Sequence, residues 1–167
     1  MVSRGRVLVA GVGNVFLGDD GFGVEVVRRL AGRGLPEGVE VVDFGIRGLD
    51  LAYALQDDYD AVIFVDATPR GGKPGTVYLL EPEIEDDGEV TLDTHGMDPV
   101  KVLRLSRAMG ATPTRTLVVG CEPQVVVGGE AYDDMLMELS EPVRAAVEEA
   151  VRLVESLVDE IDKEVRS

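Results

Sequence analysis

Short apolar runs alternate with helical patterns along the chain. Val7 to Val12 and Ala61 to Val65 are continuous apolar runs, typical of strands buried on both faces of a sheet. Residues 39–45 and 116–120 are predicted as two further strands. The loop before a fifth apolar run, at 76–80, is too short for a crossover helix, so this strand is expected to pair antiparallel at an edge.

Apolar residues three and four positions apart predict helices between the strands. The first is expected after Gly23, with Asp19 or Asp20 as its N-cap and one apolar face (Val24, Val27, Leu30 and Ala31). A short helix is predicted over 48–57, with Leu49, Ala52 and Leu55 on its inner face.

Two later helices carry clearer signals. Asp98 and Pro99 form an N-cap followed by a proline at the first helical position. The longest pattern starts at Pro142, and its apolar positions are Val143, Val147, Val151, Val154, Leu157, Val158, Ile161 and Val165. Strands that alternate with helices predict an α/β domain with a mostly parallel sheet and helices on both faces.

Composition narrows the class of protein. The 167 residues suit a single domain, and a net charge of −16 argues against nucleic acid or an anionic membrane as partners. The single cysteine, Cys121, excludes an internal disulfide and a multi-cysteine metal cluster. Because no apolar run approaches the roughly 20 residues that span a bilayer, and no signal peptide is visible, a cytoplasmic protein is expected.

The stretch from residue 7 to residue 23 leads from a buried strand to the start of a helix. Gly11 and Gly13 match the first half of a dinucleotide-binding fingerprint, but Phe16 occupies its third glycine position. Asp19 and Asp20 would repel a pyrophosphate placed there. We therefore interpret the loop as a turn that presents carboxylates, with a phosphate-binding loop as the alternative.

One histidine and two acids form the candidate site. His95 is the only histidine, in a loop before the helix at Asp98, while Asp20 and Asp66 follow the first and third strands. Because carboxyl ends of parallel strands meet at one sheet edge, these three side chains are expected together. Two carboxylates and one imidazole suit a divalent transition metal. The alternative is that Asp20 caps a helix and Asp66 accepts loop hydrogen bonds.

These residues and their order resemble the hydrogenase maturation proteases, which finish the large subunit of nickel–iron hydrogenases. The resemblance spans nearly the whole chain and rests on four motifs in order: Gly11-Val12-Gly13-Asn14 with Asp19-Asp20-Gly21, Val65-Asp66-Ala67-Thr68, Thr94-His95-Gly96-Met97, and Val119-Gly120-Cys121-Glu122-Pro123.

The resemblance implies a three-layer α/β/α sandwich around a twisted, mostly parallel five-stranded (or slightly larger) sheet, phosphorylase/hydrolase-like, as one domain over 1–167. It implies an endopeptidase that removes the C-terminal extension of a hydrogenase large-subunit precursor after nickel insertion. Asp20, Asp66 and His95 match the family's acidic and histidine positions, which contact the nickel held by the substrate. The precursor is then the partner, and no tightly bound cofactor of the enzyme's own is expected.

The chain departs from the family pattern after the second strand. Phe44 and Ile46 interrupt an Asp-Gly-Gly-Ser/Thr turn found in many members, of which Asp43 and Gly45 remain. This leaves open a member directed to another precursor or inactive. Cys121 is interpreted as a buried small hydrophobe, not as a nucleophile.

Two mechanisms and two other functions stay open. The nickel could polarise the scissile carbonyl or activate a water, or Asp20 and Asp66 could act as a general acid–base pair. A nucleotide- or phosphate-binding domain without protease activity and a metallohydrolase with its own ion are the alternative functions.

Overall fold

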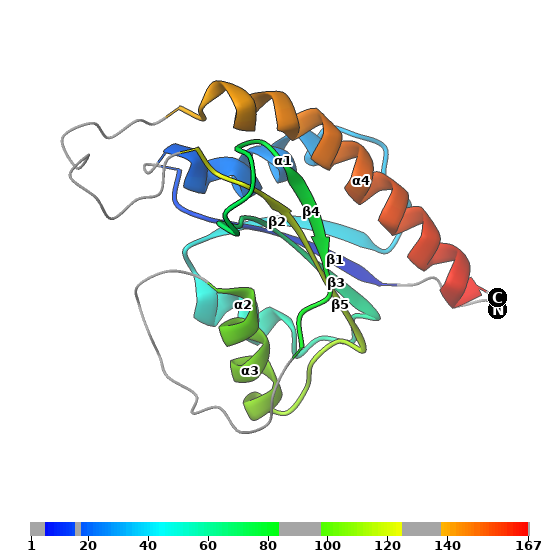
Figure 1. The fold of residues 1–167 in the computed structure, drawn as a ribbon. Helices are drawn as coiled ribbons and strands as arrows, with labels where there is room; N and C mark the ends of the chain where they lie inside the picture. The colour runs from blue at the N-terminus through cyan, green and yellow to red at the C-terminus, as the bar shows by residue number, and fades with distance from the viewer. Residues whose placement is uncertain (1–5, 16–17, 84–97, 125–137, 167) are drawn as a thin grey trace.

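The computed structural model describes residues 6–15, 18–83, 98–124 and 138–166. Ten elements follow one another in this part of the chain (Figure 1). They are β1 (Val7–Val12), η1 (Gly18–Gly21, a 3₁₀ turn), α1 (Phe22–Ala31), β2 (Val39–Gly45), α2 (Gly48–Ala54), β3 (Ala61–Ala67), β4 (Val77–Leu80), α3 (Pro99–Met109), β5 (Arg115–Cys121) and α4 (Glu141–Arg166).

The described strands form one sheet in the order β2-β1-β3-β5-β4. The pairs β1–β2, β1–β3 and β3–β5 are parallel, and β4 runs antiparallel to β5 at the edge. The mostly parallel five-stranded sheet and its antiparallel edge strand are therefore confirmed. The antiparallel pairing follows from the short connection, because residues 68–76 leave no room for a helical crossover.

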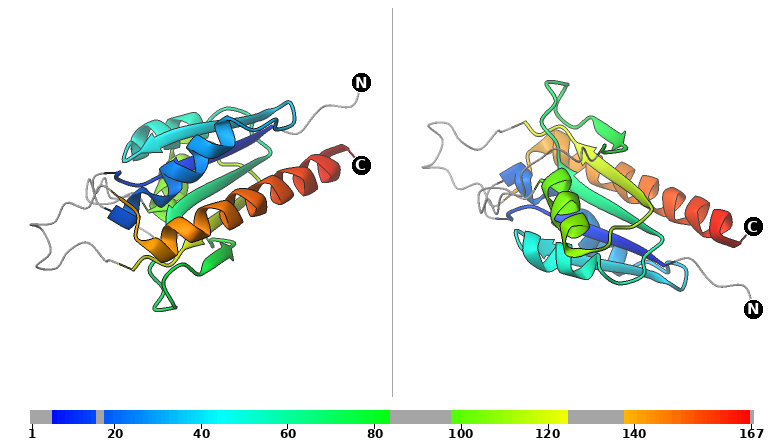
Figure 2. Two further views of the ribbon diagram at one scale, coloured as in Figure 1. Left: turned by 90° about the horizontal axis from the view of Figure 1, so that it is seen from above. Right: turned by 90° about the horizontal axis from the view of Figure 1, so that it is seen from below.

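Helices cover both faces of the sheet, as Figures 1 and 2 show. α1 and α4 lie on one face and α2 and α3 on the other, so the three-layer α/β/α arrangement is confirmed. Successive residues of a strand enter opposite cores: Val7 and Val9 pack toward α1 and α4, and Leu8 and Ala10 toward α2 and α3. This two-sided burial explains why β1 and β3 are apolar without interruption.

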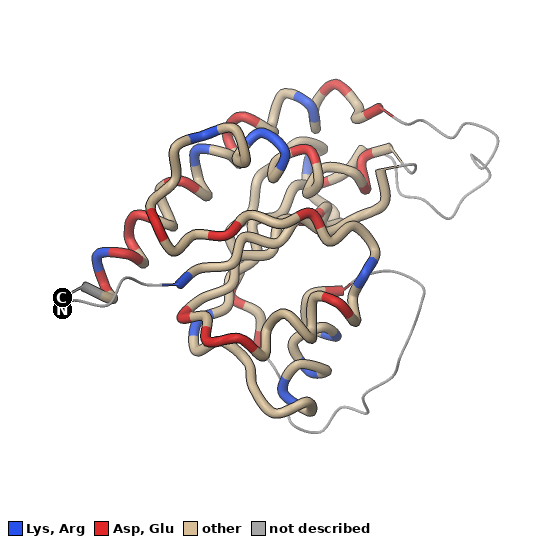
Figure 3. The backbone as a smooth tube through the Cα atoms, turned by 180° about the vertical axis from the view of Figure 1, so that it is seen from behind, with Lys and Arg blue, Asp and Glu red and all other residues tan. Residues whose placement is uncertain are grey.

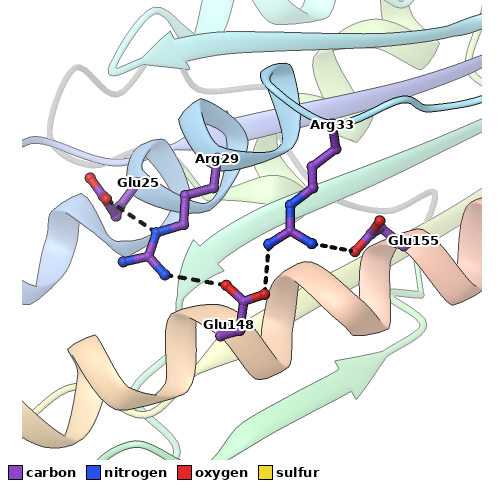
Figure 4. A network of polar contacts seen from close by, with 5 residues as sticks. All are labelled: Glu25, Arg29, Arg33, Glu148 and Glu155. Atoms are coloured by element: carbon purple, nitrogen blue, oxygen red, sulfur yellow. Dashed lines mark hydrogen bonds and ion pairs between the residues drawn. The ribbon is translucent and has the colours of Figure 1, made fainter.

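α1 and α4 are joined by ion pairs as well as by apolar packing (Figure 4). Glu148 of α4 forms ion pairs with Arg33 at 2.6 Å and with Arg29 at 3.4 Å. Arg33 also forms an ion pair with Glu155. Figure 3 shows acidic residues spread over most elements, so these arginines offset part of the repulsion on this face.

The predicted face of α2 needs correction. The helix ends at Ala54 instead of residue 57, and Leu51, Ala52 and Leu55 are buried, whereas Leu49 is 59% exposed. A helix of seven residues has fewer than two turns, so its apolar residues allow two rotations of the helix about its axis. The packing against α3 selects the rotation that buries Leu51 and exposes Leu49. The side-chain amide of Gln56 strengthens that packing by donating to the backbone oxygens of Ser106 and Ala111.

The first and third helices agree better with the sequence. In α1, Val24, Val27 and Leu30 are buried as expected, but Ala31 is exposed at the end of the helix. Asp98 caps α3 as predicted, since its Oδ1 accepts a hydrogen bond from the Val100 amide. Among the described residues, no helix is long and apolar enough to cross a membrane.

Candidate active site

The turn that carries Asp20 lies directly on the carboxyl ends of β1 and β3. A Cβ atom added at Gly23 would lie 1.9 Å from the carbonyl oxygen of Val65 and 2.5 Å from that of Val12. Since real Cβ atoms do not approach so closely, only glycine lets the start of α1 sit on these strand ends. This contact brings η1 to the edge at which β3 presents Asp66.

The Asp20 carboxylate is held from the first loop. Its Oδ2 accepts a hydrogen bond of 2.8 Å from the Asn14 amide, and the side chain is half-buried. A Cβ atom at Gly13, where φ is +134°, would lie 1.8 Å from the Asp20 carbonyl oxygen. Gly13 is thus needed for the close approach of the Asp20 backbone, in agreement with a turn that presents carboxylates.

Asp66 occupies the end of β3 and is only 7% exposed. Burial raises the pKa of Asp66 well above its usual value of 3.8, the nearby charge of Asp20 raises it further, and the Ala67 amide opposes the shift. Burial also raises the pKa of Asp20, although the Asn14 hydrogen bond opposes it. The structure therefore brings together the two acids that the sequence singled out.

The third predicted residue, His95, lies outside the described residues. In the part of the chain that the structure does describe, no three histidine, cysteine, aspartate or glutamate side chains converge as a metal site. Asp98, where the described chain resumes, contributes a charge that further raises the pKa of Asp66.

Asp19 has a role that the sequence did not reveal. It does not cap α1, and neither does Asp20: the N-cap is Gly21, and no side chain caps that helix. Instead the Asp19 carboxylate is 1% exposed and binds Gln124 and Ser140. The two adjacent aspartates carry no sequence signal that tells them apart, because either fits the start of a helix.

Glu122 is a further buried carboxylate at this edge, after Asp66 and Asp19, and is 4% exposed. Its Oε1 accepts hydrogen bonds from the Tyr78 hydroxyl at 2.8 Å and from the amides of Gly72 and Arg70 at 2.8 and 2.9 Å. Glu122 therefore organises the loop between β3 and β4.

Cys121 is fully buried in the core formed with α1 and α4. Burial raises the pKa of its thiol to about 12, with further contributions from Asp19 and other acids. A thiol of that kind is almost entirely protonated at neutral pH, so its interpretation as a small hydrophobe is confirmed.

The two residues that depart from the family pattern after β2 differ in burial. Phe44 is buried with the α2 and α3 core, and the Arg47 guanidinium stacks over its ring. Ile46 is 65% exposed, after Gly45 at φ +55°. The first departure from the family pattern thus contributes to packing, and the second changes the surface.

Comparisons with known proteins show the family of the chain. A family model described as hydrogenase maturation protease matches residues 24–157. The chain is 32% identical over 150 residues to a putative hydrogenase maturation protease of Methanocaldococcus jannaschii (89% of this chain, 93% of the relative) and 31% identical over 162 residues to the hydrogenase 2 maturation protease of Escherichia coli (95% and 97%).

A solved structure extends the similarity to the fold. The hydrogenase maturating endopeptidase HybD from Escherichia coli superposes with a TM-score of 0.73 at 28% identity, covering 93% of each chain. Since the family model matches most of the chain and these relatives cover nearly all of it, the chain belongs to the hydrogenase maturation protease family, a family of peptidases.

Proposed function

We propose that this protein removes the C-terminal extension of a nickel–iron hydrogenase large-subunit precursor, and that nickel already bound by the precursor marks it as ready. The observation that carries the proposal is the pair of carboxylates, Asp20 and Asp66, which meet at the ends of β1 and β3. The family supports the endopeptidase activity, and the chemistry of the site supports the recognition step.

The donor set suits a check on a metal held by another protein. Carboxylate and imidazole groups bind first-row divalent metals, and Ni²⁺ is high in their order of affinity. Asp20, Asp66 and His95 would supply a partial set of ligands, which completes the coordination of a substrate metal without enclosing it. The nickel is therefore part of the substrate, and the enzyme's residues orient the peptide bond beside it.

His95 is part of the proposed site because it matches the family's histidine position and precedes Asp98 in the sequence. The charge of Asp98 acts on Asp66, and His95 is three residues earlier in the sequence. His95→Ala therefore belongs among the variants that test the site.

The two acids differ in a way that suits acid–base work. Asp66 is the more buried, and burial together with the charge of Asp20 favours its protonated form. Burial also raises the pKa of Asp20, but Asp20 is only half-buried and its Oδ2 accepts a hydrogen bond from the Asn14 amide, which opposes the shift. Asp20 is therefore the acid of the pair that ionises more easily. In the acid–base mechanism, Asp20 takes a proton from the attacking water and Asp66 gives one to the leaving amine. In the metal-assisted mechanism the substrate's nickel polarises the scissile carbonyl, and the two acids hold the nickel in place.

Cleavage of purified precursor by single variants tests the site. Asp20→Asn, Asp66→Asn and His95→Ala are each expected to reduce processing by roughly 100-fold or more, the effect typical of lost acid–base groups. Asp57→Asn, which changes an exposed carboxylate beyond α2, is the matched control and should process normally. Retention of wild-type processing by all three site variants would contradict the proposal.

Nickel recognition needs its own comparison. The wild-type enzyme is given nickel-loaded precursor and the same precursor prepared without nickel, and the released C-terminal peptide is measured by mass spectrometry. Only the loaded precursor should be cleaved. Equal cleavage of both would overturn the recognition step while leaving the endopeptidase activity intact.

A further inference from the structure

Asp19 accepts three hydrogen bonds from described residues that are distant in sequence. Its Oδ1 accepts from the Ser140 amide at 2.7 Å, and its Oδ2 accepts from the Gln124 amide and the Ser140 hydroxyl, both at 2.8 Å. The side chain is 1% exposed. Hydrogen bonds to a buried charge are strong and sensitive to geometry, so this carboxylate fixes the position of its own backbone.

The donors come from two different elements. Gln124 follows β5, and Ser140 directly precedes α4, whose residue Arg144 donates its amide to the Ser140 carbonyl. One carboxylate therefore ties η1 to the end of a strand and to the start of the longest described helix. The negative charge is also favourable at the positive end of α4.

Asp20 is the next residue of the same four-residue turn. Its other support comes from the first loop, where Gly13 packs against its backbone and the Asn14 amide donates to its carboxylate. The first loop and the Asp19 contacts are thus two separate sets of contacts that hold the turn.

We propose that Asp19 is a positioning residue, whose carboxylate anchors η1 to Gln124 and Ser140 and so fixes Asp20 beside Asp66. It does not touch the reacting atoms, because its two oxygens are engaged with these donors. The adjacent aspartates divide the work: Asp19 secures the turn, and Asp20 faces the substrate.

Asp19→Asn tests the proposal, and Glu122→Gln is its matched control. Both replace a buried carboxylate that accepts hydrogen bonds from three donor groups of the described residues, at the same end of the sheet. Glu122, however, supports the β3–β4 loop instead of η1. Both variants should lower Tm. Only Asp19→Asn should lower kcat for precursor cleavage, by more than about tenfold, with KM little changed, because misplacement of a reacting group acts mainly on the chemical step.

A spectroscopic signal reports on Asp20 without any substrate. The Asn14 amide donates to Asp20 Oδ2, so its proton shift in a two-dimensional NMR spectrum changes when that carboxylate moves. The Asn14 signal should move in Asp19→Asn and stay in place in Glu122→Gln. An unmoved Asn14 signal, or a kcat no lower than that of Glu122→Gln, would overturn the positioning role.

A milder variant covers the case in which Asp19→Asn does not fold. Ser140→Ala removes only the hydroxyl donor and leaves the Ser140 amide bond to Asp19. It should shift the Asn14 signal in the same direction to a smaller extent, and no shift would count against the proposal.

The inference rests on the proposed function only through the kcat measurement. A wild-type enzyme that fails to cleave the precursor would contradict the proposed function. A wild-type enzyme that cleaves, with an unmoved Asn14 signal in Asp19→Asn, would contradict the positioning role alone.

Discussion

Burial and the charge of Asp20 together raise the pKa of Asp66, although the two residues lie on different elements. Each acid therefore makes the ionisation of the other less favourable. Such a pair is costly to the fold at neutral pH and useful to an enzyme that moves protons. The cost leads to a measurable consequence for stability.

Asp66→Asn should stabilise the folded protein at neutral pH while abolishing cleavage. Because the pKa of Asp66 is raised in the folded state, its contribution favours folding below pH 3.8 and is lost as the pH rises through the folded-state pKa. Asparagine has no proton to lose. Urea unfolding should therefore show a gain in the free energy of unfolding near pH 7 that shrinks toward about pH 4. A gain independent of pH would contradict the assignment of the shift to Asp66.

Gly13→Ala should reduce cleavage by displacing Asp20. The added Cβ atom would lie 1.8 Å from the Asp20 carbonyl oxygen, so the turn must shift, and a displacement of about 1 Å can cost roughly 100-fold in rate. Gly34→Ala is the control, because a Cβ atom there meets nothing within 4 Å. Steady-state kinetics on the precursor compares the two variants, and equal rates would show that the close approach is not needed.

Cys121 should be inert toward thiol reagents until the protein unfolds. Its side chain is fully buried and its pKa is raised to about 12, so the reactive thiolate is both scarce and inaccessible. Labelling with iodoacetamide should be slow in buffer and fast in guanidinium chloride. Cys121→Ala should retain precursor cleavage, and its complete loss in a folded variant would point to a catalytic thiol.

Arg33→Gln should lower Tm in a manner that depends on salt. Arg33 joins Glu148 and Glu155 of α4, and these half-exposed ion pairs are screened as ionic strength increases. The difference in Tm from wild type should shrink at high salt. Arg28→Gln, in α1 five residues before Arg33, is the control, since no ion pair involving Arg28 is present among the described residues. A similar Tm change for both variants would exclude a specific contribution of the Arg33 ion pairs.

The central sheet could be predicted from the sequence because its signal is local. β1 and β3 are apolar at every position before their ends, and that pattern has few alternatives in a chain of this length. The phase of α2 could not be predicted, since Leu49 and Leu51 are both plausible core residues in a seven-residue helix. Only the packing of α2 on α3 distinguishes them.

In the candidate site, too, some features could be predicted from local sequence and others depend on tertiary packing. The proximity of Asp20 and Asp66 could be predicted, because Asp20 lies in the turn after β1 and Asp66 at the end of β3, at the same edge of the sheet. The separate role of Asp19 could not, because its partners Gln124 and Ser140 lie 105 and 121 residues away in sequence. Hydrogen bonds over such separations are set by the tertiary fold, which no local spacing encodes.

The place of Asp66 on the middle strand has a further consequence for how long the site persists. β3 is paired on both sides, with β1 and β5, and its neighbours separate it from both sheet edges. Fraying at an edge strand therefore leaves this acid in place, and its backbone is released only when the sheet itself comes apart. In hydrogen-exchange terms, the β3 amides should belong to the slowest class, so the lifetime of this half of the site equals the lifetime of the native state.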